Sequence, residues 1–256
     1  MSVIALTSAH GAPGVTTSAL ALVAAWEVAR PGRRVLLIDA DPAGSGVLVG
    51  PLRDGVPDRA GVSLLAATRP PLSAEQVIGC CVALDEGAMR MVLPGVADPL
   101  QARPLAATWA ALVDVARELS TRGVDVVVDA GRLGHRHEPT PWLTEADLVV
   151  VVLRGDVAGV VPAAAAARTL TMLRAGRSAP TALVVDSGSY SVAEVASAVG
   201  VREVMTIAHD ERAARSVAAG LARGMRLDRS SLMRTARSVV ERLGQLVPEP
   251  DAVVTE

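Results

Sequence analysis

The sequence contains no lysine, no asparagine and no phenylalanine, and all 25 of its basic residues are arginine. The codons of the three missing residues are AT-rich, so their absence is typical of a GC-rich genome. This bias explains the replacement of lysine by arginine. It does not explain the replacement of a lysine by an apolar residue.

Cysteine is scarce, and long apolar runs are missing. The two cysteines, Cys80 and Cys81, are adjacent, and adjacent cysteines rarely form an unstrained disulfide. We expect small apolar side chains there, and an iron–sulfur site built from separated cysteines is excluded. No apolar run reaches the ~18 residues of a membrane span. The first residues, "MSVIALTSAHG", lack the basic head and cleavage site of a secretory signal, so we expect a soluble, cytoplasmic protein.

Hydrophobic residues make up 50% of the chain and fall into short unbroken runs. Runs of Val, Ile and Leu without alternation are typical of strands covered on both faces. Five runs are strong, at 3–9, 34–40, 124–130, 147–153 and 181–187, and two weaker ones lie at 89–95 and 203–208. Helical stretches lie between the runs, at 17–29, 105–119, 157–173, 192–199 and 230–246. This alternation predicts an α/β fold with a doubly wound, mostly parallel sheet flanked by helices.

The length of 256 residues fits one α/β domain. We assign residues 1–247 to that domain and expect a disordered C-terminal tail over 248–256. Residues 43–71 are rich in Gly, Pro and Arg, so we expect an irregular, mobile surface loop there.

Glycines and charged residues occupy the points where the predicted strands end. A Gly-rich loop follows the first run, and the ends of the next three runs carry Asp39, Asp41, Asp129 and Arg154. Because the carboxyl ends of parallel strands meet at one edge of a sheet, where such folds bind ligands, we expect these residues to share one cleft.

The loop "SAHGAPGVTT" at residues 8–17 has the spacing of a phosphate-binding loop, since Gly11 and Gly14 precede a Thr pair that begins a helix. In such a loop backbone N–H groups surround the phosphates and the first Thr hydroxyl binds Mg²⁺. An ordinary tight turn fits the loop alone equally well, because Gly-x-x-Gly is common. A dinucleotide-binding fingerprint fits less well, because the Gly-x-Gly start is missing.

The wider sequence favours the phosphate-binding loop. "HGAPGVTT" followed by "VLLIDADPAGSG" resembles the MinD/ParA family of P-loop ATPases, whose deviant loop runs Lys-Gly-Gly-x-Gly-Lys-Thr-Thr and whose second strand ends in Asp-x-Asp-Pro. The similarity continues through "VDVVVDAGRLG", "ADLVVVVLRGD" and "VREVMTIAHDERAARSVAAG", over nearly the whole chain. It is closest to the branch that includes the pilus-assembly and localisation proteins CpaE and TadZ.

The resemblance implies a P-loop NTPase-like fold and a nucleotide site formed by Gly11, Ala12, Pro13, Gly14, Val15, Thr16 and Thr17. It places Thr16 on Mg²⁺, puts Asp129 on the Mg²⁺ side, and gives Asp41 the role of orienting the attacking water. The implied cofactor is ATP or ADP with Mg²⁺, and hard oxygen ligands suit that ion. The alternative is that these carboxylates are polar turn formers at strand ends. For Asp39 we expect a structural role.

The loop departs from the family pattern at both lysines. His10 stands where the signature lysine would reach the partner's nucleotide across a dimer, and Val15 stands where the general P-loop lysine would contact the β- and γ-phosphates. Ala12 replaces a glycine, and Gly131 replaces a proline after the third strand. Loss of cations impairs phosphoryl transfer more than nucleotide binding. We therefore expect slow or absent hydrolysis, with nucleotide weakly bound or absent.

Two arginines could replace the missing cations. Arg132 and Arg154 should lie just beyond strand ends, near the phosphates. Ordinary surface charge is the alternative role for each.

The C-terminal part concentrates positive charge on a chain of net charge −2. Residues 212–242 include eight arginines. In a helix over 230–246, Arg234 and Arg237 lie opposite an apolar face formed by Leu232, Ala236, Val239, Val240, Leu243 and Leu246. A closing helix with a solvated basic face explains this pattern. Contact with DNA or with an anionic membrane is the alternative.

Three functional hypotheses follow. The first is a MinD/ParA-like nucleotide switch with weakened or lost ATPase activity that positions or regulates a larger assembly, such as a pilus, secretion, partition or division apparatus. We expect this switch to be a homodimer, located in the cytoplasm or peripherally at the membrane or nucleoid. The second is a nucleotide-free scaffold that acts only through protein contacts. The third is an active ATPase whose missing lysine is replaced by an arginine or by a partner.

Overall fold

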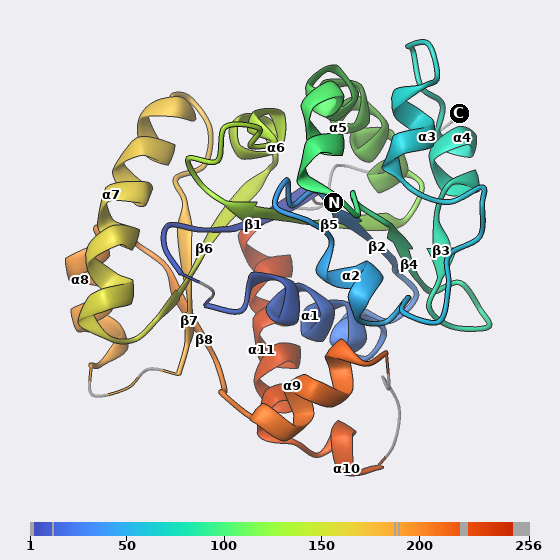
Figure 1. Ribbon diagram of the computed structural model, residues 1–256. Coiled ribbons are helices and arrows are strands. Elements are labelled where there is room, and N and C mark those ends of the chain that lie inside the picture. Colours follow the sequence, from blue (N-terminus) through green and yellow to red (C-terminus); the bar gives the residue numbers. More distant parts are fainter. Residues whose placement is uncertain (1–2, 12, 187, 189, 221–224, 248–256) are drawn as a thin grey trace, which may run out of the picture.

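The computed structural model describes residues 3–11, 13–186, 188, 190–220 and 225–247. These residues form an eight-stranded sheet with helices on both faces (Figure 1). In the order β3-β4-β2-β5-β1-β6-β7-β8, only β3 and β4 pair antiparallel. The strands are β1 (Val3–Ser8), β2 (Arg34–Asp39), β3 (Val82–Ala83), β4 (Arg90–Leu93), β5 (Val124–Arg132), β6 (Leu148–Arg154), β7 (Thr181–Val185) and β8 (Val204–Ile207). The predicted doubly wound, mostly parallel α/β sheet is confirmed.

Two hydrophobic layers enclose the sheet. In β1, Val3 and Ala5 face one layer, whereas Ile4 and Leu6 face the other, which explains why the strands read as unbroken apolar runs. The first layer is covered by α3 (Val62–Ala66), α4 (Ala74–Gly79), the 3-10 helix η1 (Pro99–Leu105), α5 (Ala106–Thr121), α6 (Thr140–Glu145), α7 (Val157–Leu173) and α8 (Val192–Val199). The second is covered by α1 (Val15–Ala29), α2 (Gly46–Val49), α9 (Glu211–Ala218), α10 (Met225–Asp228) and α11 (Ser231–Leu246).

The register brings the strand ends of the expected cleft together. Asp39 of β2 pairs with Asp129 of β5, and Asp129 also lies opposite Leu6 of β1. On the other side of β1, Ser8 pairs with Val152 of β6. The carboxyl edge of these four central strands therefore carries the loop and the predicted carboxylates.

The prediction of an irregular surface loop over residues 43–71 is wrong in part. The segment contains α2 and α3, and Val47, Val62 and Leu65 are almost completely buried in the two hydrophobic layers. These helices have four and five residues, too few to show a helical repeat among so many glycines and prolines.

Helix α11 docks on the domain through its apolar face. Leu232, Ala236, Val239, Val240 and Leu243 are buried, and Leu246 is partly buried against the same layer. This face is packed within the domain and is therefore not available for insertion into lipid. No helix in the described ranges combines the length and apolar character that a membrane crossing requires. The predicted tail, 248–256, lies outside the described residues.

Candidate functional site

The P-loop segment joins β1 to α1 and leaves the first turn of α1 without a side-chain cap. Gly14 is the N-cap residue, with a left-handed φ of 98° that favours glycine. The first backbone bond of the helix runs from the N–H of Ser18 to the carbonyl of Gly14. Because no acidic residue lies in this first turn, the preceding N–H groups and the helix dipole provide a place for an anion. Ala12 lies outside the described residues.

Thr16 is joined directly to the predicted Mg²⁺-side carboxylate. Its Oγ1 donates a hydrogen bond of 2.6 Å to Oδ2 of Asp129. The other carboxylate oxygen of Asp129 accepts the backbone N–H of Gly131 at 3.0 Å. The side chains of Thr16 and Asp129, 113 residues apart in sequence, are thus brought together as predicted.

Asp39 and Asp129 are both completely buried on neighbouring strands. Burial raises the pKa of Asp39 to about 6, against the effect of a hydrogen bond donated by the Ser45 hydroxyl. Burial, together with repulsion from Asp39, raises the pKa of Asp129 to about 7. Two neighbouring buried carboxyl groups therefore lie in an environment that disfavours their negative charge, and a cation bound beside them would relieve this cost.

Asp41 lies beside the end of β5. Its Oδ1 accepts the N–H of Ala43 at 2.8 Å. Gly131, with φ of 64°, passes so close that a Cβ there would lie 2.5 Å from the same oxygen. At Gly131, where the resemblance implies a proline, the end of β5 thus comes close to the predicted water-orienting residue.

Val15 and His10 stand at the two positions where the resemblance implies lysines. The Val15 side chain, 8% exposed, packs into the hydrophobic layer under α1. His10 is exposed at the start of the loop. Among the other predicted loop residues, Pro13 is buried and Thr17 is half-buried.

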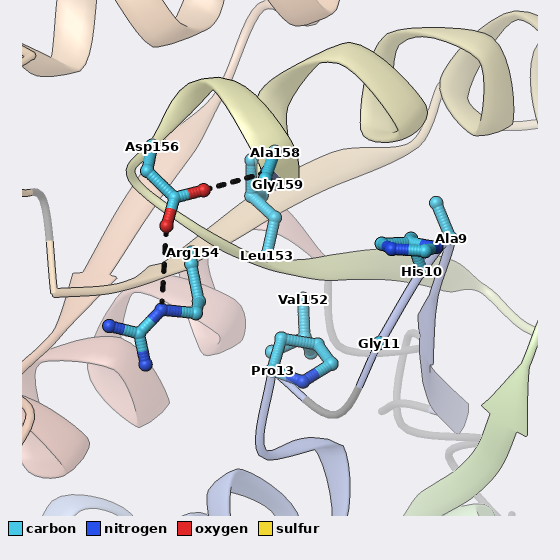
Figure 2. A pocket seen from close by; sticks show the side chains of 10 residues that line it. All are labelled: Ala9, His10, Gly11, Pro13, Val152, Leu153, Arg154, Asp156, Ala158 and Gly159. Atoms are coloured by element: carbon cyan, nitrogen blue, oxygen red, sulfur yellow. Dashed lines mark hydrogen bonds and ion pairs between the residues drawn. The ribbon is translucent and has the colours of Figure 1, made fainter.

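A pocket of about 110 Å³ lies between the P-loop and β6 (Figure 2). On the P-loop side it is lined by Ala9, His10, Gly11 and Pro13, and on the other by Val152, Leu153, Arg154, Asp156, Ala158 and Gly159. Arg154 thus lines a pocket with the P-loop, as its sequence position predicted. Arg132, the other candidate cation, ends β5 with an exposed side chain and does not line this pocket.

Mg²⁺ at this site would need ligands from the nucleotide and from water in addition to those from the protein. The Thr16 hydroxyl and the carboxylates of Asp129 and Asp41 are the hard oxygen donors that Mg²⁺ prefers. Within the described residues, no group of three or more His, Cys, Asp or Glu is arranged to hold a metal. Mg²⁺ commonly takes most of its ligands from waters and phosphates, so the donor set fits a nucleotide-bound ion.

Sequence reasoning missed two residues that shape the site. Ser45 caps α2, accepting the N–H of Leu48 at 3.0 Å, and it holds Asp39 through its hydroxyl. Asp156 caps α7. A Ser or Asp directly before a helical stretch is an N-cap signal, and the one at Asp156 was readable, since the helix at 157–173 was expected.

Two of the basic C-terminal residues are paired with carboxylates. Arg237 Nη2 lies 3.9 Å from Asp228, and Arg242 contacts both carboxylate oxygens of Glu203 at 2.7 and 2.8 Å. Arg234 is exposed.

Comparison with known proteins identifies the fold. No protein-family model matches the chain, and no curated protein matches it by sequence. Solved structures match it over nearly its whole length. The cell division ATPase MinD of Pyrococcus furiosus is 19% identical, with a TM-score of 0.74, and the match covers 96% of this chain and 100% of that one.

Two further structures extend the comparison. The septum site-determining protein MinD of Pyrococcus horikoshii OT3, complexed with Mg-ADP, is 17% identical with a TM-score of 0.73, over 95% of this chain and 96% of that chain. A ParA family ATPase of Chlorobium tepidum is 14% identical with a TM-score of 0.70, over 93% and 98%. The chain therefore has the fold of the MinD/ParA P-loop ATPases.

Proposed function

We propose that this protein is a MinD/ParA-like nucleotide switch with weakened or lost ATPase activity. The observation that carries the proposal is the hydrogen bond between Thr16 and Asp129 at the uncapped start of α1. An ordinary tight turn needs neither a hydroxyl that donates to a buried carboxylate nor uncapped N–H groups at the start of the following helix. A P-loop needs both, because the first binds Mg²⁺ and the second bind phosphate.

The residues of the loop would share the work of holding Mg-ATP or Mg-ADP. Backbone N–H groups at the start of α1 would bind the phosphates, and the Thr16 hydroxyl oxygen would be a ligand of Mg²⁺. The ion would neutralise charge on the β- and γ-phosphates. Asp129 would hold the water shell on the Mg²⁺ side, and Asp41 would orient the attacking water. The similar MinD of Pyrococcus horikoshii is complexed with Mg-ADP, which supports this choice of cofactor.

Weak hydrolysis follows from the residues at the two positions where the resemblance implies lysines. Val15 is apolar and packed inward, and His10 is exposed at the start of the loop. Charge stabilisation in the transition state is the largest contribution to phosphoryl transfer. In a loop that retains its N–H groups, the absence of the lysine should lower the rate of hydrolysis more than the affinity for nucleotide.

The wider role we propose is to position or regulate a larger assembly, as a homodimer. The resemblance to the CpaE and TadZ branch supports a pilus or secretion apparatus, and the partition and division systems of other MinD/ParA proteins are the alternatives. The arginines of α9 to α11, including Arg234 and Arg237, form the surface that we propose contacts DNA or an anionic membrane.

Binding of a fluorescent ATP analogue with and without Mg²⁺, together with a phosphate-release assay, tests the proposal. Mg²⁺-dependent binding with little or no turnover supports the switch. No binding supports a nucleotide-free scaffold. Turnover at the rate of an ordinary ATPase supports an active enzyme, in which an arginine or a partner replaces the lysine in catalysis and not only in binding.

A further inference from the structure

The turn between β6 and α7 is held in a fixed position beside the P-loop. The N–H of Gly155 donates to the carbonyl of Asp186, at the end of β7, at 3.0 Å. Gly159, in the first turn of α7, packs so closely that a Cβ there would lie 2.4 Å from the carbonyl oxygen of Arg154. The backbone at Arg154 is therefore constrained from two sides, which is the support that a binding residue requires.

The Arg154 guanidinium is held at one nitrogen. Its Nε lies 3.6 Å from Oδ2 of Asp156, while Oδ1 of Asp156 accepts the N–H of Gly159 at 2.8 Å and caps α7. In Figure 2 the two terminal nitrogens of Arg154 point away from Asp156, and neither donates a hydrogen bond to another residue in the described ranges. The two side chains are 51% and 53% exposed, and ion pairs so exposed are weak.

Arg154 is also one of the residues that line the pocket between the P-loop and β6. In Figure 2, Arg154 and Asp156 lie on one side of this pocket and His10 on the other, with Pro13 between them in the view. The free fork of nitrogens suits a phosphate, which an arginine can bind with two parallel hydrogen bonds. A phosphate also carries more negative charge than the carboxylate that now holds Nε.

We propose that Arg154 binds a phosphate of the nucleotide in place of the missing P-loop lysine, and that Asp156 is a positioning residue that competes with the phosphate for it. The inference rests on the proposed function, because it concerns the same nucleotide. It selects Arg154 over Arg132, since Arg154 alone of the two shares a pocket with the P-loop.

Calorimetric titration with Mg-ATP tests this inference in four variants of the full chain. Arg154→Ala should weaken binding by about tenfold, the usual loss for a charged hydrogen-bonding partner. Asp156→Asn keeps a capping side chain on α7 and should tighten binding about threefold, because the phosphate then meets no competitor. In the double variant, Arg154→Ala with Asp156→Asn, this gain in affinity should disappear. Arg168→Ala, which removes an exposed arginine from the same helix, is the matched control and should bind like the parent.

Each contrary result has its own meaning. If Arg154→Ala binds Mg-ATP like Arg168→Ala, Arg154 makes no phosphate contact and the inference falls, while the proposed function stands. If the Asp156→Asn gain persists without Arg154, Asp156 acts only through its charge and the competition is refuted. If the parent itself binds no Mg-ATP, both the inference and the proposed function fail. Thermal unfolding of Arg154→Ala and Arg154→Lys shows whether either variant has lost the fold as well as the contact. In a titration, Arg154→Lys should recover part of the affinity that Arg154→Ala loses.

Discussion

The hydroxyl of Thr16 and the carboxylate of Asp129 are joined by a hydrogen bond of 2.6 Å, although the two residues are 113 positions apart. One begins the helix after β1 and the other lies in β5, the strand paired with β1. The bond exists because both strand ends meet at the carboxyl edge of a parallel sheet. It places the hydroxyl that would bind Mg²⁺ against a buried carboxylate.

Restoring the P-loop lysine should tighten nucleotide binding. In Val15→Lys the aliphatic stem can follow the apolar surface around Val15 while the amine reaches the phosphates. We expect Mg-ATP to bind about tenfold more tightly, the value of one charged hydrogen bond. Val15→Met, which adds length without charge, is the control for calorimetry. Equal affinities in these two variants would mean that the loop does not face a phosphate.

Removing Asp41 should separate hydrolysis from binding. Any turnover of the parent should fall roughly a hundredfold in Asp41→Ala, because the orientation of water matters in the transition state and little in the ground state. Affinity for Mg-ATP should remain near that of the parent. Asp54→Ala, at an exposed position, controls for loss of charge alone. Unchanged phosphate release in Asp41→Ala would remove Asp41 from the mechanism.

The metal-free protein should become less stable as the pH rises from about 4 to about 7. Folding raises the pKa of Asp39 to about 6 and of Asp129 to about 7, mainly by burial, so the folded state binds protons that the unfolded state has released. The two protonated carboxyl groups contribute fully to stability below the pKa that they have in the unfolded chain. This contribution is lost as the pH rises from about 4 to about 7. Urea unfolding in EDTA should show Asp129→Asn with a flatter pH profile and higher stability than the parent at pH 8.

Asp58→Asn, an exposed substitution, should leave that profile unchanged. A parent protein that gains stability between pH 4 and 7, with Asp129→Asn parallel to it, would show that these carboxyl groups are already ionised in the folded state.

The basic face of α11 should give weak, salt-sensitive binding to an anionic partner. We expect binding to duplex DNA or to anionic liposomes at low salt that falls steeply as salt is added, because counterion release and screening govern such contacts. Arg234→Glu with Arg237→Glu should abolish it. Arg168→Glu with Arg202→Glu, at exposed positions elsewhere, is the charge-matched control. If the parent binds neither ligand, the arginines are solvated surface and the partners are other proteins.

The sequence predicted the central sheet because its strands are covered on both faces. The run ending at Asp129 and the run ending at Asp39 carry this signal, and their register then places both carboxylates at one edge. Short elements gave no such signal, and α2 was missed although Val47 is completely buried. Its four residues are anchored by tertiary contacts that no local pattern records.

Contacts between distant residues were equally hidden. Asp125 is completely buried and accepts the indole N–H of Trp26 at 3.0 Å and a guanidinium nitrogen of Arg33 at 2.5 Å. The sequence shows these residues as one strand residue, one helix residue and one residue of the turn between the two expected elements, with nothing to pair them. At the candidate site the orientation of Val15 into the hydrophobic layer was hidden for the same reason, since the sequence gives the residue type but not the direction of its side chain.

The central claim, that the loop from Gly11 to Thr17 still holds a nucleotide, is tested most directly by a crystal structure of the protein grown with excess Mg-ATP. We expect density for the phosphates over the start of α1, with Mg²⁺ beside the Thr16 hydroxyl and near Asp129. A well-ordered loop with no nucleotide density, in crystals whose packing leaves the cleft open, would contradict it.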